Sequence, residues 1–395
     1  MSEKAPHGHF ERAAAADWLD ANERHRIDAG LRRRLNPRAP SSDVLDLASN
    51  DYLGLGSHAD VKAAAIDAIE QWGTGSTGSR LVTGTTTAHI DLETKLAEFM
   101  GQEAALVFSS GYAANLGVVT ALAGRGSLIV SDGGSHASLV DACRLSRARV
   151  VVIERGDVEQ ARIALAERTE ERALVVTDSV YSVDGELAPL REMYEAARDN
   201  GALMLADEAH GLGVRGRGGR GYVDELGLAG REDLIVTATL SKALGSQGGV
   251  VFGSRRLIDH LIDTARTFIF DTGLNPAAVG AAGAALEQLV ATPTLADDVL
   301  ANARELAEAA GAEEPQSAVV SVIIGDPSKA VAARDEMRSR GVSVGCFRPP
   351  SVPVGTSRLR LTARANLTKG DLERACETLR KVLAGMDRGS EAGRG

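Results

Sequence analysis

The chain has 395 residues, of which 44% are apolar and 25% are charged, and this composition is ordinary for a globular protein with a large core and room for two domains. Its net charge of -10 argues against a general binder of nucleic acid or of anionic membranes. The three cysteines are scattered and form no CxxC pair, which predicts reduced thiols, a cytoplasmic protein and no metal site.

The N-terminal segment has early charges and no apolar core, so it does not resemble a signal peptide. Residues 17–35 are predicted to form a short amphipathic helix that ends in Arg32, Arg33 and Arg34, and residues 36–43 a turn-rich link. The charge-free span 104–124 has the length of a membrane helix, but it carries serines, a glycine and an asparagine at its centre. These polar residues argue against a membrane span.

From the link to about residue 255, short apolar runs alternate with helical stretches. Each run is rich in Val, Ile and Leu on successive residues, which is typical of strands buried on both faces in a parallel sheet. The seven runs are AALVF (104–108), SLIVSD (127–132), ARVVVIE (148–154), ALVVTDS (173–179), ALMLADE (202–208), DLIVTATLSK (233–242) and GGVVFG (248–253). We therefore expect an α/β fold in which helices such as 157–172 and 190–201 cover a mostly parallel seven-stranded sheet.

After residue 290 the pattern changes to one dominated by helices, with three strands predicted at 318–325, 342–347 and 358–363. A final helix is expected to begin near Thr368, which forms a capping-box pair with Asp371. This part of the chain predicts a smaller C-terminal α/β domain. The predicted organisation is an N-terminal helical segment (1–45), a large domain (46–285) and a small domain with a disordered tail (286–395).

Polar side chains follow five of the predicted strands, at the point where each strand ends. The strand ends bring a glycine turn in SSGYAAN (109–115), His136, Ser182, Asp207 with His210, and Thr239 with Lys242. Each side chain alone has an ordinary explanation, such as a capped turn or a lysine that reaches water. Because ligands of open α/β sheets bind beyond the carboxyl ends of the strands, their shared placement favours one site.

The chemistry of this set is specific. A lysine in apolar surroundings has a lowered pKa and can form a Schiff base with an aldehyde. A carboxylate such as Asp207 can pair with a protonated ring nitrogen, and a helix N-terminus can hold a phosphate. The cofactor that needs all three groups is pyridoxal 5'-phosphate.

Six motifs together resemble those of the α-oxoamine synthases, which are fold-type I pyridoxal-phosphate enzymes. The motifs are ASNDYLGL (48–55), SSGYAAN (109–115), SHASLVDA (135–142), SVDGELAPL (182–190), DEAHGLGV (207–214) and TLSKALG (239–245). The resemblance extends from about Leu31 to Ala384. It implies a transferase that condenses an amino acid with an acyl thioester and releases CO2.

The resemblance also implies roles for individual residues. Lys242 would carry the cofactor aldehyde as a Schiff base and later act as a base, and Asp207 would pair with the pyridine nitrogen. His136 would stack on the ring, while His210 and Ser182 would bond its phenolic oxygen. The phosphate would be bound by Thr239, by the backbone of Gly111 and Tyr112, and by Thr272 of a partner subunit, which implies a homodimer. Substrate would be held by Asn50 and Arg360 at the amino-acid carboxylate, by Arg32 at a far carboxylate and by Arg348 at the entrance.

Within the family, CFRPPSVPVGTSRLRLTA (346–363) and GLRRRL (30–35) resemble the 8-amino-7-oxononanoate synthase branch. This branch acts in biotin biosynthesis and joins L-alanine to pimeloyl-CoA or pimeloyl-acyl carrier protein. Some positions depart from the family pattern: Ser135 replaces a frequent Asn, Asp178 a common Glu, and Arg364–Asn366 a segment with a histidine. These departures concern substrate handling.

Several alternatives remain open. The basic run Arg32–Arg34 has the ordinary explanation of a solvated helix end. GVRGRGGRG (213–221) resembles an RNA-binding Arg/Gly box, but it follows DEAHGL inside the predicted core, so we interpret it as an ordered loop near the site. Other functions to weigh are a 2-amino-3-oxobutyrate CoA ligase, a serine palmitoyltransferase-like synthase, an ordinary aminotransferase and a non-enzymatic nucleotide-binding protein. The last would normally carry a GxxxxGK[ST] run, which this sequence lacks.

Overall fold

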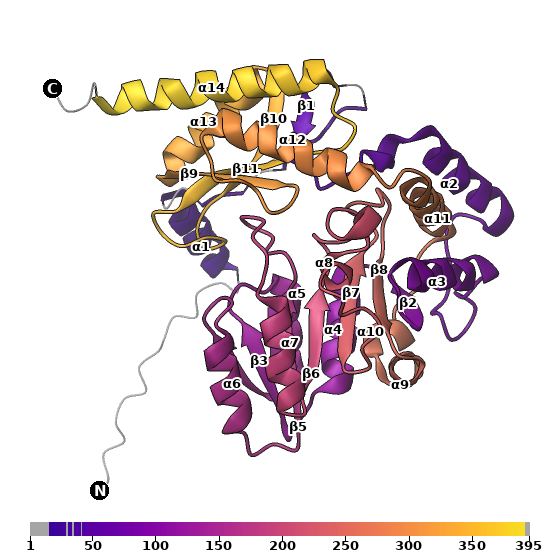
Figure 1. Cartoon of the computed structure of the whole chain (residues 1–395). Helices are drawn as coiled ribbons and strands as arrows, with labels where there is room; N and C mark the ends of the chain where they lie inside the picture. Colours follow the sequence, from indigo (N-terminus) through magenta and orange to yellow (C-terminus); the bar gives the residue numbers. More distant parts are fainter. Residues whose placement is uncertain (1–15, 29–30, 34, 41, 392–395) are drawn as a thin grey trace, which may run out of the picture.

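The computed structural model describes residues 16–28, 31–33, 35–40 and 42–391. These residues form a large α/β unit around a seven-stranded sheet and a smaller unit around a four-stranded sheet (Figure 1). Both sheets were expected from the sequence, and the predicted fold class is confirmed.

The seven-stranded sheet has the order β2-β8-β7-β6-β5-β3-β4. Its strands are β2 (Ala104–Phe108), β3 (Ser127–Asp132), β4 (Arg149–Ile153), β5 (Arg172–Asp178), β6 (Leu203–Asp207), β7 (Leu234–Thr239) and β8 (Gly249–Gly253). All neighbours from β7 to β4 are parallel, whereas β8 is antiparallel to both β7 and β2. Six strands lie within their apolar runs and β5 begins one residue before its run, because a strand buried on both faces needs apolar residues at successive positions.

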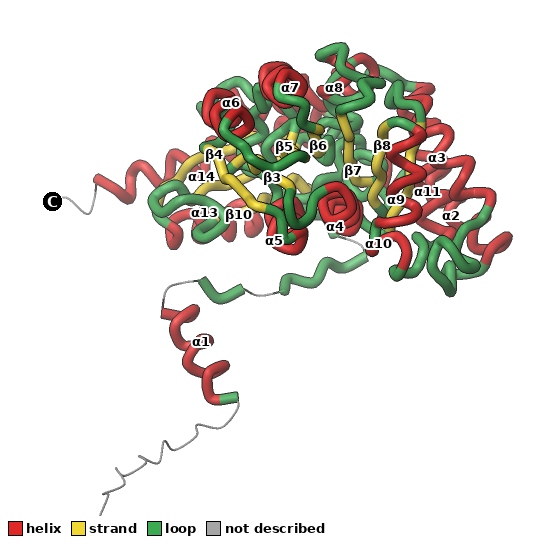
Figure 2. Tube along the Cα trace, turned by 90° about the horizontal axis from the view of Figure 1, so that it is seen from below, coloured by secondary structure: helices red, strands yellow, loops and turns green. Residues whose placement is uncertain are grey.

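Helices cover both faces of this sheet (Figures 1 and 2). One face packs on α4 (Gly111–Leu122), α5 (Ala137–Ser146), α9 (Arg255–Thr264) and α10 (Arg266–Ile269). The other packs on α3 (Thr87–Phe99), α6 (Val158–Ala166), α7 (Leu190–Asp199), α8 (Tyr222–Glu225) and α11 (Pro276–Ala291). Successive residues of β3 alternate between the two cores, as the pleat requires: Leu128 and Val130 in one, Ile129 in the other.

The four-stranded sheet has the order β1-β10-β11-β9. Its strands are β1 (Leu45–Leu47), β9 (Val319–Gly325), β10 (Val342–Phe347) and β11 (Ser357–Thr362), and its helices are α12 (Leu295–Ala310), α13 (Pro327–Ser339) and α14 (Lys369–Glu391). The remaining helical segments of the described chain are α1 (Asp17–Asp28), α2 (Ala59–Trp72) and the short 3-10 turns η1 (Leu55–Ser57) and η2 (Arg217–Gly219). The three predicted C-terminal strands and the Thr368–Asp371 capping pair are confirmed.

β1 was not predicted. It has only three residues, and it gains its order by pairing in parallel with β10, about three hundred positions later in the chain. This pairing adds Leu45–Leu47 to the small sheet, and the predicted boundary between residues 285 and 286 falls inside the continuous helix α11. The domain boundaries 1–45, 46–285 and 286–395 therefore stay a proposal. The pairing of β1 with β10 places a segment from near residue 45 in the sheet of the small unit.

The predicted helix 17–35 was wrong in extent, because α1 ends at Asp28. No residue of α1 is buried, and the helix stands apart from the rest of the molecule in Figure 2. Because α1 has no packed face, a further helical turn would add no tertiary contacts that stabilise it. Arg34, the last arginine of the predicted helix end, lies outside the described residues.

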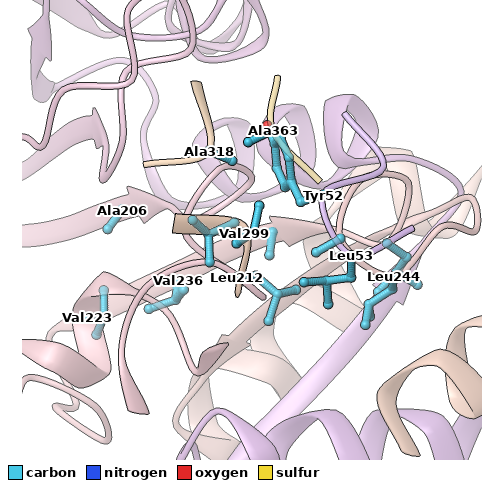
Figure 3. Close-up of a cluster of buried hydrophobic side chains, with 14 of the residues drawn as sticks. Tyr52, Leu53, Ala206, Leu212, Val223, Val236, Leu244, Val299, Ala318 and Ala363 are labelled. Atoms are coloured by element: carbon cyan, nitrogen blue, oxygen red, sulfur yellow. The ribbon is translucent and has the colours of Figure 1, made fainter. Parts of the chain in front are cut away.

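The two sheets share one hydrophobic core. Figure 3 shows Val299, Ala318 and Ala363 of the small unit close to Tyr52, Leu53, Leu212 and Leu244. Leu212 and Leu244 belong to the segments that follow β6 and β7 of the large sheet. This packing fixes the loops beyond the strand ends between two rigid sheets. Among the described residues, no helix is both long and apolar enough to span a membrane.

Candidate active site

The carboxyl ends of the parallel strands open onto a cavity of about 260 Å³. β5 ends at Asp178, β6 at Asp207 and β7 at Thr239, and Lys242 follows three residues after the end of β7. The cavity is lined by Ser110, Gly111, Tyr112, Asn115, His136, Ser138, Asp178, Asp207, Ala209, His210, Thr239, Ser241 and Lys242. Parallel pairing places these strand ends at the same edge of the sheet, as the sequence predicted.

The amine of Lys242 lies inside this cavity. Its Nζ is 2.9 Å from Nε2 of His210. Burial lowers the pKa of Lys242 to about 8, against the opposing charges of Asp207 and Asp178. Roughly a tenth of the amine is therefore neutral at pH 7, several hundred-fold more than for an ordinary lysine, and only the neutral amine can attack an aldehyde or accept a proton.

His210 connects this amine to the segment 50–52. Its Nδ1 contacts the hydroxyl of Tyr52, and that hydroxyl donates to Oδ1 of Asn50 at 3.3 Å. Because Tyr52 gives its proton to Asn50, it must accept from Nδ1 of His210, which leaves Nε2 to accept from Lys242. Burial and the charge of Lys242 lower the pKa of His210 well below its usual value, in agreement with a neutral ring.

Asp207 is a buried carboxylate with two N–H donors. Oδ2 accepts from Nδ2 of Asn115 at 2.7 Å, and Oδ1 accepts from the backbone N–H of Ala209 at 2.9 Å. Both bonds stabilise the charged form and fix the plane of the carboxylate. The group can therefore pair with a cationic ring nitrogen in the cavity.

His136 caps helix α5. Its backbone N–H donates to Oδ1 of Asp178 at 3.0 Å, and its Nδ1 accepts from the backbone N–H of Ser138 at 3.2 Å. Burial lowers the pKa of His136, and burial together with the charge of Asp207 raises the pKa of Asp178. The ring is thus a neutral, fixed wall of the cavity.

Helix α4 begins at the edge of the cavity, with Ser110 as its N-cap. A Cβ on Gly111 would lie 3.1 Å from Cβ of Thr239, so glycine lets the helix start approach β7 closely. Oγ1 of Thr239 bonds to Oγ of Ser241 at 2.6 Å. A helix N-terminus flanked by two hydroxyls has the chemistry of a phosphate site.

Arg360 is a buried cation beside this cavity. Its Nη1 donates to Oδ1 of Asn50 at 3.0 Å, and its Nε donates to the carbonyl oxygen of Ser182 at 2.8 Å. Through Asn50 and Tyr52, the guanidinium is linked to His210. A planar donor in this place can bind a carboxylate in a fixed orientation.

The sequence was then compared with known proteins. The aminotransferase class I and II family matches residues 42–379. The 8-amino-7-oxononanoate synthase of Mycolicibacterium gilvum is 62% identical over 368 residues, which are 93% of this chain and 97% of that protein. That of Mycobacterium marinum is 62% identical over 369 residues, 93% of this chain and 95% of that protein. The chain belongs to the class I and II aminotransferase family, in its 8-amino-7-oxononanoate synthase branch.

Solved structures of this family superpose on the chain. A serine palmitoyltransferase from S. paucimobilis, with a bound PLP–myriocin aldimine, has a TM-score of 0.88 and 31% identity, and covers 95% of this chain and 100% of its own. An 8-amino-7-oxononanoate synthase from Francisella tularensis has a TM-score of 0.73 and 25% identity, and covers 86% of this chain and 98% of its own. The fold-type I architecture expected from the motifs is thereby confirmed.

For this family member, most of the predicted site residues meet at one place. Lys242, Asp207, His210, His136, Thr239, Gly111 and Tyr112 line the cavity, and Asn50, Ser182 and Arg360 form a connected group beside it. Ser182 takes part through its backbone carbonyl oxygen, which accepts the hydrogen bond from Nε of Arg360. The functional role of each residue stays a prediction.

Three predicted residues lie elsewhere in the chain. Arg32 and Arg348 line a separate cavity of about 730 Å³, together with Leu31, Arg33 and Asn36 and with residues of the small unit. Nη2 of Arg32 forms an ion pair with Glu23 at 2.8 Å. Thr272 is exposed and pairs in a β-bridge with Ser79. Thr272 is not among the residues that line the cavity of its own chain, and its role toward a partner subunit stays a prediction.

The sequence reasoning missed Tyr52, Asn115 and Ser138. All three stand inside motifs that it had singled out, in ASNDYLGL, SSGYAAN and SHAS. Helical spacing was the available signal for Asn115, because residues 111 and 115 of a helix share one face. The loop GVRGRGGRG, interpreted as ordered, forms turns in which the N–H of Gly213 donates to the carbonyl of Gly219 at 2.7 Å.

Proposed function

We propose that this chain is a pyridoxal-phosphate-dependent acyltransferase that condenses L-alanine with a pimeloyl thioester, releases CO2 and forms 8-amino-7-oxononanoate in biotin biosynthesis. The relatives at 62% identity carry the name 8-amino-7-oxononanoate synthase. The observation that carries the proposal is that the buried amine of Lys242 and the carboxylate of Asp207 line the same cavity as the N-terminus of α4.

The residues of the cavity fit pyridoxal 5'-phosphate. Lys242 would bind its aldehyde carbon, Asp207 its ring nitrogen and His136 its ring face. His210 and Ser182 would serve its phenolic oxygen. The backbone of Gly111 and Tyr112, Thr239, and Thr272 of the partner subunit would serve its phosphate. When bound, the cofactor supplies an electron sink for the negative charge that develops on the α-carbon of the amino acid.

The protein's own groups then have distinct tasks. Arg360 and Asn50 hold the carboxylate of L-alanine and so orient its Cα–H bond. The neutral amine of Lys242 accepts the α-proton, and His210, as the acceptor at Nε2, keeps the nitrogen lone pair turned away from its own ring. Asp207 keeps a proton on the ring nitrogen. Positioning by these groups accounts for most of the rate that the protein itself supplies.

The acyl thioester would approach from the arginine-lined cavity. Phe347 lines that cavity, and the guanidinium of Arg360, which is linked to His210 through Asn50 and Tyr52, lies 5.6 Å from the centre of its ring. Arg32 would bind the far carboxylate of the pimeloyl chain, and Arg348 would line the entrance. The carrier is coenzyme A or an acyl carrier protein, and the enzyme acts as a cytoplasmic homodimer.

The experiment that tests the proposal is a product mass measurement with pyridoxal 5'-phosphate, L-alanine and pimeloyl-CoA. The expected result is 8-amino-7-oxononanoate together with CO2, and no product from Lys242→Ala. Glycine or serine, and acyl-CoAs of other lengths, serve as competing substrates. Faster turnover of serine with a long-chain acyl-CoA would assign another activity of the family, and keto-acid formation without loss of CO2 would indicate an ordinary aminotransferase.

A further inference from the structure

Asn115 is a buried amide that makes three side-chain hydrogen bonds at the back of the cavity. Its Nδ2 donates to Oδ2 of Asp207 at 2.7 Å and to Oγ of Ser138 at 2.8 Å, and its Oδ1 accepts from Oγ1 of Thr237 at 2.7 Å. The amide therefore joins three strands or helices, β6, β7 and α5, through a residue of α4. Both of its N–H groups are used.

The orientation of this amide is determined by its partners. A carboxylate oxygen of Asp207 can only accept, so the side of the amide that faces it must be the NH2 group. The hydroxyl of Thr237 donates to the other side, which must then be the oxygen. A flipped amide would set its oxygen against Asp207 and lose both bonds.

The same logic reaches His136 through Ser138. Oγ of Ser138 accepts from Asn115, so its own proton is free to go to Nδ1 of His136, 2.8 Å away. Nδ1 also accepts from the backbone N–H of Ser138, and because a backbone N–H can only donate, Nδ1 must be unprotonated. The proton of the neutral imidazole is then on Nε2.

We propose that Asn115 is a positioning residue that couples the two cofactor-facing side chains: it holds the carboxylate of Asp207 and, by directing the hydroxyl proton of Ser138, adds a second donor to Nδ1 of His136. The inference rests on the proposed function for the identity of the ligand, a phosphorylated pyridinium aldehyde. The coupling itself is a property of the unliganded protein. One amide thus presets both the charge that meets the ring nitrogen and the polarity of the edge of the imidazole.

A purely structural role for Asn115 predicts a different outcome. A buried amide that only joined helix α4 to the sheet would, on removal, lower stability and leave His136 unchanged. The two roles are separated by a readout of the imidazole. The charged groups that face His136 are Asp207 and Lys242, and its backbone N–H donates to Asp178. The variants below leave these three residues in place, so a change in the imidazole signals reports on Asn115.

The first test uses the apo protein labelled with ¹⁵N-histidine, in which ring-nitrogen shifts report the tautomer. His136 is assigned by the loss of its signals in His136→Asn. In the parent protein we expect an unprotonated Nδ1 and a protonated Nε2. In Asn115→Ala the backbone N–H of Ser138 still donates to Nδ1, so we expect Nδ1 to stay unprotonated and its signal to shift because the hydrogen bond from the Ser138 hydroxyl is weakened. Val119→Ala, on the same buried helix, is the matched control and should lose stability with an unchanged imidazole.

The second test measures the dissociation constant of pyridoxal 5'-phosphate by fluorescence quenching. Asn115→Ala should weaken binding roughly 10- to 100-fold, the effect of one hydrogen bond to a charged group, and Asn115→Asp by at least as much, because it sets a second carboxylate against Asp207. Thr237→Val, which removes the donor to Oδ1 of Asn115 and so loosens the amide, should shift the imidazole signals less than Asn115→Ala, and Thr237→Ser should restore them.

Unchanged ring-nitrogen shifts of His136 together with unchanged cofactor affinity in folded Asn115→Ala would overturn the proposal. A shifted Nδ1 signal with weaker affinity supports it. These readouts do not depend on the acyl substrate, so a failure of the product assay with L-alanine and pimeloyl-CoA would count against the proposed function and leave the coupling intact.

Discussion

At the scale of single residues, the chemistry depends on a lysine that folding holds partly neutral. In the sequence, Lys242 lies between hydroxyl-bearing residues and a glycine-rich run, and residues 237–249 contain no other charged side chain. In the fold its amine is buried at 2.9 Å from His210, and burial lowers its pKa to about 8. The neighbouring carboxylates of Asp207 and Asp178 oppose this shift and keep it from going further.

The first prediction concerns the pH dependence of covalent cofactor attachment to the apo protein. Since the pKa of Lys242 is lowered from 10.5 to about 8, the reactive neutral amine appears as pH rises through 8. The rate constant for attachment, followed by the visible absorption band and by borohydride trapping, should rise with pH and reach half its plateau near pH 8. The control is Nα-acetyl-lysine, whose free side-chain amine titrates at about pH 10.4. A protein profile that follows the control would contradict the buried amine.

Residue roles differ in how far the sequence could predict them. Lys242 and Asp207 stand at strand ends, and the edge of a parallel sheet brings strand ends together whatever the details of packing. Tyr52 and Asn115 act through other side chains, and such contacts depend on rotamers and on helix placement. Arg32 and Arg348 were predicted by resemblance alone, and they line a cavity of their own.

At the scale of elements, burial on two faces made the strands predictable. All seven strands of the large sheet coincide with apolar runs, because a strand covered by helices on both faces needs apolar side chains at most of its positions. β1 has three residues and no such run, and its order comes from β10. The end of α1 was equally hidden, because a helix without a buried face has no periodic apolar stripe to mark its extent.

A second prediction concerns the segment between α2 and α3, which a buried ion pair ties to β2. Nη1 of Arg80 donates to Oε1 of Glu93 at 2.9 Å and to the carbonyl of Val107 at 3.0 Å. Arg80→Met leaves the Glu93 carboxylate buried without its cation, which should lower the free energy of unfolding by about 3–5 kcal/mol. Urea denaturation of the apo protein measures this value.

The control for this prediction is Arg304→Met, which removes an exposed ion pair with Glu314. Its loss should cost less than about 1 kcal/mol, because exposed pairs are screened by water. Equal midpoints for the two variants would show that the Arg80 pair does not hold the segment.

At the scale of the whole molecule, the described chain presents apolar side chains near Thr272. Val82 is 78% exposed and Phe270 is 68% exposed, and their two turns are tied together by the Ser79–Thr272 bridge and by the bond from Gly273 to Gly78. A second copy of the chain that covered these side chains would bury apolar surface. The proposed homodimer further requires that Thr272, in the same turn, reach the cavity of the other copy.

The last prediction tests this sharing of sites by mixing two inactive variants. Lys242→Ala lacks the amine, and Thr272→Val lacks the hydroxyl proposed to reach the partner's phosphate site. In a mixed dimer, one cavity carries both changes, whereas the other combines an intact Lys242 with an intact Thr272. After unfolding and refolding of an equal mixture, about a quarter of the parental activity should therefore return, because half of the dimers are mixed and each has one complete site. Product formation from L-alanine and pimeloyl-CoA measures the recovery. If Thr272→Val is fully active alone, or if the mixture stays as inactive as its parts, Thr272 serves no partner cavity.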